Sequence, residues 1–201
     1  MKPQLRSLKK LPRAIEYIKN KETKYKRFNL YFADESRFGL LTRIKRVLCM
    51  KGVKPIAPFQ HKFDYLYLFG AFSPVNGSSL ILEMPFCNTA AMQVFLDELS
   101  EMDREELKIV VLDNAAFHHT RSLIIPLNIR LIFLPPYSPE LNPAEKIWWV
   151  IKNKTSMQVY PTIEDLQKHL SHIIESLSPQ SIKQISDYDY IQKTYQTLFN
   201  V

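Results

Sequence analysis

The pattern of apolar and polar positions predicts a sheet in the first part of the chain, followed by alternating helices and strands. Runs rich in aromatic and β-branched residues, bounded by turn residues, indicate strands. These runs lie at 28–36, 65–73, 78–86, 107–113 and 129–135. The turn PVNG at 74–77 joins the second and third runs, so the early strands are expected to be antiparallel. Residues 37–48 are compatible with one more strand of that group.

Helical periodicity is clearest at 89–102, where apolar residues recur at three- and four-residue steps from Met92 to Leu99. Thr89 is the expected N-cap of this helix. Further helices are expected at 13–27, 116–126, 143–154 and 163–176. The run at 107–113 is continuously apolar, which suits a strand buried on both faces. The order predicts an α/β fold whose mixed sheet is antiparallel in its first strands and then parallel, with helices on both faces.

Composition places the chain among globular proteins. Its 201 residues suit one domain of ordinary size with an extension, and 46 % apolar residues suffice for a core. No apolar run is long enough for a membrane span, and the basic N-terminus lacks the apolar segment of a secretory signal. Cys49 and Cys87 lack metal-site spacing, so we expect reduced thiols in a cytosolic protein.

The net charge of +7 is unevenly distributed. Residues 1–27 contain ten Lys or Arg and two Glu, a net of 10 − 2 = +8, which leaves −1 for residues 28–201. We interpret 1–27 as a basic helical arm or linker and 28–201 as the main domain with C-terminal helices. A second basic cluster occupies 43–54. Such clusters favour polyanions, above all nucleic acid, although a solvated helix face is the alternative.

Two aspartates stand at the ends of predicted strands. Asp34 follows the apolar run that begins at Phe28, and Asp113 closes the run that begins at Leu107. A carboxylate after an apolar run is costly unless it has a partner. Ligands of open α/β sheets bind beyond the carboxyl ends of the strands. The two aspartates therefore meet if their strands are neighbours.

Glu145 lies at the start of a predicted helix, within the proline-rich segment LPPYSPELNPAEKIW (134–148). Asn142, Pro143 and Glu145 fit the N-cap, N1 and N3 positions, so Glu145 can complete a capping box. The alternative is that the stiff loop fixes the helix so that its first turn brings Glu145 to the two aspartates. The sequence is compatible with both.

Three converging carboxylates repel one another at pH 7 unless cations lie among them. Carboxylate oxygens without His or Cys suit Mg²⁺ or Mn²⁺. Two such ions, roughly 3.5–4 Å apart, can activate an attacking oxygen and stabilise a leaving oxygen in phosphoryl transfer. We therefore expect a site for two Mg²⁺ or Mn²⁺ ions if Asp34, Asp113 and Glu145 converge.

Three blocks together resemble the signatures of a known family. FADESRFG (32–39), VLDNAAFHH (111–119) and LPPYSPELNPAEKIW (134–148) are similar to the blocks of DDE transposases of the mariner superfamily, above all its bacterial insertion sequence 630 branch. The resemblance covers about residues 28–152. It implies a ribonuclease H-like fold and a metal-bound catalytic triad at Asp34, Asp113 and Glu145.

The same resemblance implies a reaction and its partners. Water attacks a phosphodiester at the end of the element, and the freed 3′ hydroxyl attacks target DNA without a covalent protein–DNA intermediate. The expected partners are double-stranded DNA of element ends and target and a second copy of the chain, in the bacterial cytoplasm and at the nucleoid. Family members carry an N-terminal helix-turn-helix module. Residues 1–27 show no such helix pair, so we expect the chain to correspond to the catalytic part.

Further residues are candidates for contacts with DNA: Arg37, Asn114, His118, Lys146 and Lys152. Asn114 and His118 match the second block, although Asn114 can instead cap the helix that follows. Exposed helix lysines can instead serve solubility alone. Glu35 is expected to point away from Asp34, because successive strand side chains alternate between faces. One tryptophan of the pair 148–149 is expected in the core.

Two other functions remain open from the sequence. One is a non-catalytic DNA-binding or oligomerisation fragment of a decayed or split transposase. The other is a different ribonuclease H-like nuclease, such as one that cuts RNA–DNA hybrids with the same carboxylates. A carbohydrate hydrolase with two acids fits less well, because neither the third carboxylate nor the basic arm would have a purpose there.

Overall fold

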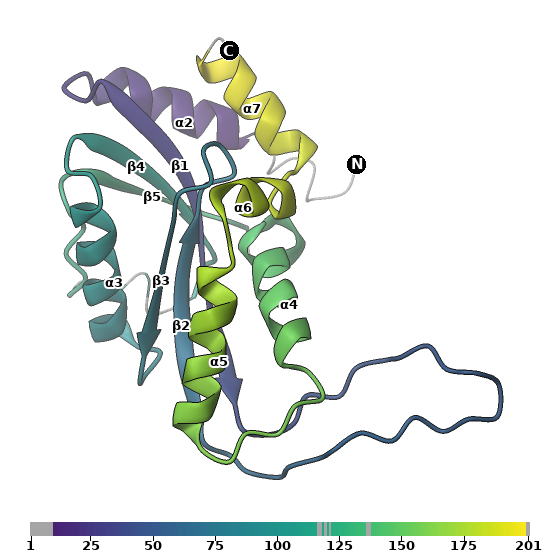
Figure 1. Cartoon of the computed structure of the whole chain (residues 1–201). Coiled ribbons are helices and arrows are strands. Elements are labelled where there is room, and N and C mark those ends of the chain that lie inside the picture. Colours follow the sequence, from purple (N-terminus) through teal and green to yellow (C-terminus); the bar gives the residue numbers. More distant parts are fainter. Residues whose placement is uncertain (1–9, 116–117, 119, 121, 136–137, 200–201) are drawn as a thin grey trace.

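The computed structural model describes residues 10–115, 118, 120, 122–135 and 138–199. These residues form a five-stranded sheet in the order β3-β2-β1-β4-β5, with helices packed on both faces (Figure 1). The strands are β1 (Arg27–Gly39), β2 (Tyr65–Phe72), β3 (Ser79–Met84), β4 (Glu106–Leu112) and β5 (Ile129–Phe133). The helices are α2 (Lys10–Lys21), α3 (Thr89–Glu101), α4 (Ala144–Thr155), α5 (Ile163–Glu175), α6 (Pro179–Ile185) and α7 (Asp189–Phe199), with a 3-10 turn η2 (Pro139–Leu141).

β1 is the central strand and joins the two halves of the sheet. It runs antiparallel to β2 and parallel to β4, while β2 pairs antiparallel with β3 and β4 pairs parallel with β5. The predicted turn between β2 and β3 is present, with the Ser73 N–H donating to the Ser78 carbonyl at 2.8 Å. Gly77 has a φ of +79° there, which favours glycine. The mixed sheet predicted from the sequence is confirmed.

Alternate side chains of β1 lie on opposite faces of the sheet. Tyr31 and Ala33 pack with Phe95 of α3 on one face. On the other face, Phe32 packs in the cluster under α2 and α7, and Phe38 packs in the cluster under α4 and α5. This strict alternation fixes which residues of β1 face α4.

The basic helix α2 packs on the sheet. Leu11 and Ile15 of α2 are buried with Leu30 of β1 and Ile191 of α7, and α2 and α7 lie side by side (Figure 1). The aspartate- and tyrosine-rich segment at 186–190 carries no clear signal in the sequence, but Asp189 begins α7. The division of the chain at residue 27 stays a prediction. None of the described helices is long and apolar enough to cross a bilayer.

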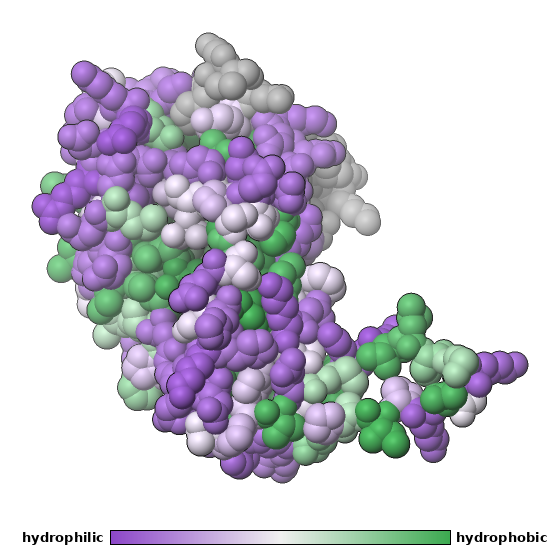
Figure 2. Space-filling model, viewed as in Figure 1, coloured by the Kyte–Doolittle hydropathy of each residue, from purple (hydrophilic) through white to green (hydrophobic). Residues whose placement is uncertain are grey.

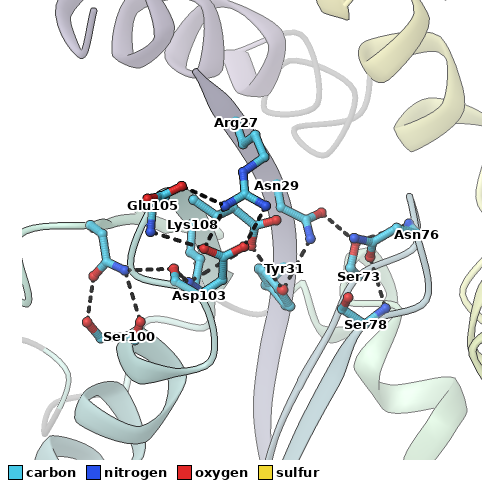
Figure 3. A network of polar contacts seen from close by, with 12 residues as sticks. Arg27, Asn29, Tyr31, Ser73, Asn76, Ser78, Ser100, Asp103, Glu105 and Lys108 are labelled. Atoms are coloured by element: carbon cyan, nitrogen blue, oxygen red, sulfur yellow. Dashed lines mark hydrogen bonds and ion pairs between the residues drawn. The ribbon is translucent and has the colours of Figure 1, made fainter. Parts of the chain in front are cut away.

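A polar network holds the other end of the sheet, where β1 and β4 begin (Figure 3). Lys108 of β4 is fully buried, and its ammonium donates to the Asp103 carbonyl. Asn29 accepts a hydrogen bond from the Ser73 hydroxyl at 2.7 Å and donates to the Tyr31 hydroxyl at 3.1 Å. Because these groups satisfy one another, buried polar residues here tie β1, β4 and the end of β2 together.

Two local predictions were wrong. Residues 37–48 do not form a second strand: β1 ends at Gly39, whose partner Tyr65 is the first residue of β2. Beyond this pair, Leu40 and Thr42 donate single backbone hydrogen bonds to Asp64 and Gln60. The cap of α3 is Asn88, not Thr89: the Asn88 side chain accepts a hydrogen bond from the Ala91 N–H at 2.9 Å.

The helix predicted at 116–126 falls partly on residues 116, 117, 119 and 121, which lie outside the described residues. The described residues 123–126 are not helical. The backbone N–H of Ile124 donates to Gln93 of α3 at 2.7 Å, so this segment is bound to α3.

A long loop, residues 40–64, joins β1 to β2 and extends away from the body of the molecule (Figure 1). Its base is anchored: Leu40 N–H donates to the Asp64 carbonyl at 2.9 Å, and Met157 N–H donates to the Arg43 carbonyl at 2.9 Å. Apolar and basic side chains alternate along its outer part (Figure 2). Leu48 and Ile56 have relative exposures of 105 % and 97 %.

Candidate active site

Asp34 and Asp113 leave neighbouring strands at the same height. Phe32 of β1 is aligned with Val111 of β4, and each aspartate lies two residues further on. The register therefore places Asp34 and Asp113 side by side at the ends of the paired segments of β1 and β4. β4 ends at Leu112, while β1 continues to Gly39, so the half-buried Asp34 lies where the sheet narrows. The adjacency expected from the strand ends is present.

The start of α4 is fixed to β1 by one side chain. Asn142 is 2 % exposed. Its amide donates to the Ala33 carbonyl at 2.9 Å, and its carbonyl accepts a hydrogen bond from the Ala144 N–H at 3.1 Å. Asn142 therefore binds the backbone next to Asp34 and the first turn of α4 at the same time.

The capping-box alternative for Glu145 is not realised in the described structure. Helix α4 begins at Ala144 with Pro143 at the N-cap and no side-chain capping bond there, and Glu145 is exposed in the first turn. Residues 136–137 of the proline-rich segment lie outside the described residues. The geometry agrees with the alternative in which the loop positions Glu145.

Trp148 seats α4 on the sheet. It is 1 % exposed and contacts Phe38 and Phe72 at ring-centroid distances of 6.2 and 5.4 Å. Gly70, the β2 partner of Asp34, leaves room for this ring, since a Cβ there would lie 2.7 Å from the indole. The prediction that one of the two tryptophans lies in the core is confirmed.

The pKa of Asp34 reflects the carboxylates around it. Burial, followed by the charges of Glu145, Glu35 and Asp113, raises the pKa of Asp34 from 3.8 to about 8. The charges of the other two predicted acids, and that of Glu35, therefore act on Asp34. Without a cation, Asp34 holds its proton at neutral pH.

His118 links Asp113 to Glu35. Its Nδ1 lies 3.1 Å from a carboxylate oxygen of Asp113, and its Nε2 lies 3.0 Å from a carboxylate oxygen of Glu35. Burial favours the neutral ring, but the hydrogen bonds with Asp113 and Glu35 outweigh it and raise the pKa of His118 to about 9. The same oxygen of Asp113 also accepts from the Ala115 N–H at 3.0 Å. Asp113 is thus held in place by its own loop.

Glu35 is the participant that the sequence did not reveal. It points to the opposite face of β1 from Asp34, as the alternation of strand side chains predicts. From there it reaches Asp113 only through His118, a contact between residues 83 positions apart. No local pattern signals such a contact.

The other candidates surround the carboxylates. Arg37 lies over the Tyr65 ring at 5.2 Å, Lys146 over the Tyr188 ring at 3.8 Å, and Lys152 over the Phe38 ring at 5.6 Å. Lys152 is near enough to Glu145 and Asp34 for their charges to act on it. Asn114 is exposed directly after Asp113. Contacts of these residues and of His118 with DNA stay predictions.

The donor set fits a hard divalent cation in its chemistry. Asp34, Asp113 and Glu145 offer carboxylate oxygens, and their mutual repulsion is what a cation would relieve. Among the described residues, no three His, Cys, Asp or Glu side chains form a group that could hold a metal ion. The carboxylates are therefore neighbours in this structure without being drawn together around a common point.

Comparison with known proteins decides the family. A family model described as "DDE superfamily endonuclease" matches residues 29–167. The chain belongs to this DDE superfamily. A protein of Sinorhizobium fredii, "Uncharacterized protein y4pE/y4sA", is 39 % identical over 107 residues, which are 52 % of this chain and 79 % of that protein.

Solved structures of Mos1 mariner transposase share the fold of this DDE protein. The "Mos1 transposase paired-end complex with left transposon end" has a TM-score of 0.65 at 16 % identity, covering 100 % of this chain and 62 % of that one. The "Mos1 mariner paired end complex with Mn" has a TM-score of 0.65 at 14 % identity, covering 100 % of this chain and 63 % of that one. These matches confirm the predicted ribonuclease H-like fold, and this chain spans less than two thirds of the Mos1 chain. Assignment to the insertion sequence 630 branch stays a prediction.

Proposed function

We propose that this DDE protein is the catalytic domain of a transposase that cleaves DNA phosphodiesters at element ends and joins the freed 3′ hydroxyl to target DNA. The observation that carries the proposal is that Asp34 lies at the sheet edge close enough to Asp113 and Glu145 for both of their charges to act on it. The DDE family match and the Mos1 fold support it.

Asp34, Asp113 and Glu145 would hold Mg²⁺ or Mn²⁺, as two ions. When bound, the ions would activate the attacking oxygen and stabilise the charge on the leaving oxygen. The chain prepares the ligands beforehand: β1 fixes Asp34, His118 and Ala115 hold Asp113, and the Asn142 bridge sets the helix that carries Glu145. Water would attack the phosphodiester and the 3′ oxygen would leave as a hydroxyl. That hydroxyl would then attack a phosphodiester of the target and displace a 3′ oxygen of the target strand, which takes up the proton.

Double-stranded DNA and a second copy of the chain are the proposed partners. The basic arm at 1–27 and the basic cluster at 43–54 supply cations for phosphates. The exposed apolar side chains of the 40–64 loop are what a protein partner would cover. The Mos1 paired-end complex contains a left transposon end, which supports DNA as a partner here.

The triad is tested by removing one carboxylate charge at a time. Asp34→Asn, Asp113→Asn and Glu145→Gln should each reduce Mg²⁺-dependent cleavage of element-end DNA by at least about 10³-fold, because each removes a ligand of the ions. Asp97→Asn, an exposed aspartate of α3, is the matched control and should cleave like the wild type. Full activity in any triad variant would remove that residue from the site.

A non-catalytic DNA-binding fragment is the second candidate. It is favoured by the lack of a preformed metal-binding group among the described residues. Calorimetric titration of Mn²⁺ in the presence of DNA separates the two functions. Binding by the wild type that disappears in Asp34→Asn supports the enzyme, whereas equal or absent binding in both supports the fragment.

A further inference from the structure

A pocket of about 250 Å³ lies beside the proposed catalytic carboxylates. It is bounded by the end of β1, by the two ends of the 40–64 loop (residues 41–43 and 62–64) and by the last turns of α4. None of the triad residues lines it. Its position and its lining indicate a binding site of its own.

Four cations line this pocket. Arg37, Arg43, Lys62 and Lys152 line it, and Asp64 is the acidic residue among the lining residues. Within the described chain, none of these four cations forms a salt bridge. Burial and then the charge of Arg43 lower the pKa of Lys152, so the cations repel one another as the triad carboxylates do. An anion in the pocket would relieve that repulsion.

Aromatic side chains also line the pocket. Phe63 and Tyr65 are exposed, whereas Phe38 and Tyr160 are buried in the core. Cations next to exposed aromatic rings are the combination that binds nucleotides, since phosphates pair with the cations and bases stack on the rings. An inorganic anion would leave Phe63 and Tyr65 unused.

The frame of the pocket is built before any ligand arrives. Gln60 donates to the Tyr160 carbonyl at 2.9 Å and accepts from the Tyr160 N–H at 3.1 Å. Lys62 donates to the Pro161 carbonyl at 2.9 Å. These bonds join the loop base to the connection between α4 and α5, so little ordering is required when a ligand binds.

The spacing of Lys152 and Glu145 gives the distance between the pocket and the proposed catalytic site. Lys152 follows Glu145 by seven residues on α4, so the two share a helix face about 10 Å apart. About three stacked nucleotides at ~3.4 Å each span that distance along one strand of a duplex. We propose that the pocket binds a backbone phosphate of the cut DNA strand about three nucleotides from the scissile bond, with the attached base unpaired and placed against Phe63 and Tyr65. This assignment of DNA as the ligand rests on the proposed function.

Neutral substitutions in the loop base test the pocket. In the full chain with EDTA, fluorescence anisotropy of a labelled 30-base-pair duplex gives the Kd at several salt concentrations. Arg43→Gln with Lys62→Gln should weaken binding about tenfold and lower the slope of log Kd against log salt by about one, the value for one phosphate contact. Lys168→Gln with Lys183→Gln removes equal charge from exposed positions outside the pocket and should change Kd less than about twofold.

A second measurement, the fluorescence of a base analogue, tests where the base lies. With 2-aminopurine placed singly at each of the first six nucleotides from a nick, its fluorescence should change most on binding near the third, and this change should be lost in the double variant. An unchanged salt slope with no position-dependent change in fluorescence would overturn the pocket, as would equal losses in the control variant. Thermal melting of both double variants excludes unfolding as the cause.

The outcomes separate the pocket from the catalytic proposal. If the wild type cleaves DNA and the Arg43/Lys62 variant binds like its control, the pocket fails and the transposase stands. If no DNA is cleaved but that variant binds DNA more weakly, has the smaller salt slope and loses the change in 2-aminopurine fluorescence, the pocket stands and the catalytic proposal fails.

Discussion

At the scale of the residue, the candidate site is a place where the fold accepts an unfavourable arrangement. Asp34 is half-buried, and its neighbours are acids rather than bases. A hydrophobic or amide side chain would cost less at this position. Natural proteins retain such strain mainly where function requires it, so the raised pKa of Asp34 is the residue-level sign of the site.

Asp34→Asn should stabilise the metal-free protein, and the gain should grow with pH. The pKa of Asp34 is about 8 in the folded chain and ordinarily 3.8, so the folded state binds the proton more tightly. The wild type therefore loses stability as the pH rises from 3.8 towards 8. Asparagine does not titrate, so we expect little difference at pH 4 and a gain of roughly 1–3 kcal/mol at pH 8. Urea unfolding in EDTA measures both values.

Asp34→Asn also tests how a metal ion affects the melting temperature. Adding Mg²⁺ should raise the melting temperature of the wild type, because a cation that binds only the folded state stabilises it. Asp34→Asn should show no such rise, and Asp97→Asn should behave like the wild type. If Asp34→Asn were less stable than the wild type at pH 8 in EDTA, the repulsion inferred between Asp34 and the neighbouring carboxylates would be contradicted.

Glu35 is a positioning residue, since it acts on Asp113 through His118. Glu35→Gln should lower the cleavage rate about tenfold, the usual loss when a partner behind a metal ligand is changed. DNA affinity should stay within about twofold of the wild type, because Glu35 supplies no cation to the substrate. Glu98→Gln, an exposed glutamate of α3, is the matched control for single-turnover cleavage. A rate equal to that of the control would remove Glu35 from the site.

At the scale of the element, helix α4 is the part whose placement decides whether the acids meet. Its two attachments come from opposite sides: Asn142 binds the β1 backbone, and Trp148 fills the space above Gly70. The sequence shows that a helix begins near Asn142, but the bond to Ala33 crosses 109 positions. A capping pattern cannot reveal a contact made outside the helix it caps.

Asn142→Ala should separate this attachment from ordinary capping. It removes the acceptor of the Ala144 N–H and leaves the Ala33 carbonyl without its partner, so we expect a loss of roughly 1–3 kcal/mol of stability. Cleavage should fall about 10²-fold even below the melting transition, because Glu145 is no longer held at its position. Asn88→Ala is the control, since Asn88 caps α3 without contacting β1. It should cost about 1 kcal/mol and leave the cleavage rate unchanged. Equal cleavage rates in the two variants would show that the bridge does not position Glu145.

Strands were predictable because their apolar runs and turn residues are local signals. The meeting of Asp34 and Asp113 was predicted on the condition that their strands are neighbours, and β1 and β4 do pair. The loop at 40–64 was harder, since Val47 and Leu48 resemble strand residues but pair with no strand in the described part of the chain. The pairing of His118 with Glu35 was not predictable, because it depends on how a loop folds over the other face of β1.

At the scale of the whole molecule, charges of opposite sign are separated along α4. Carboxylates gather at its first turn, and the cations of the pocket gather at its end. Beyond the pocket, the loop extends apolar side chains into solvent (Figure 2). A partner that covered those side chains would lie next to bound DNA, so assembly and substrate binding would be coupled through one segment.

Self-association should depend on the apolar side chains of the loop. Leu48→Ser with Ile56→Ser keeps every cation of the loop and changes side chains that contact little of the chain itself, so the fold and the Kd for DNA should stay unchanged. If a second copy covers these side chains, sedimentation velocity with DNA present should show self-association weakened by at least about tenfold. Val94→Ser, on an exposed apolar residue of α3, should have no effect. A wild type that sediments as one copy on DNA at every concentration would exclude the dimer, and an unchanged dimer in the loop variant would place its interface elsewhere.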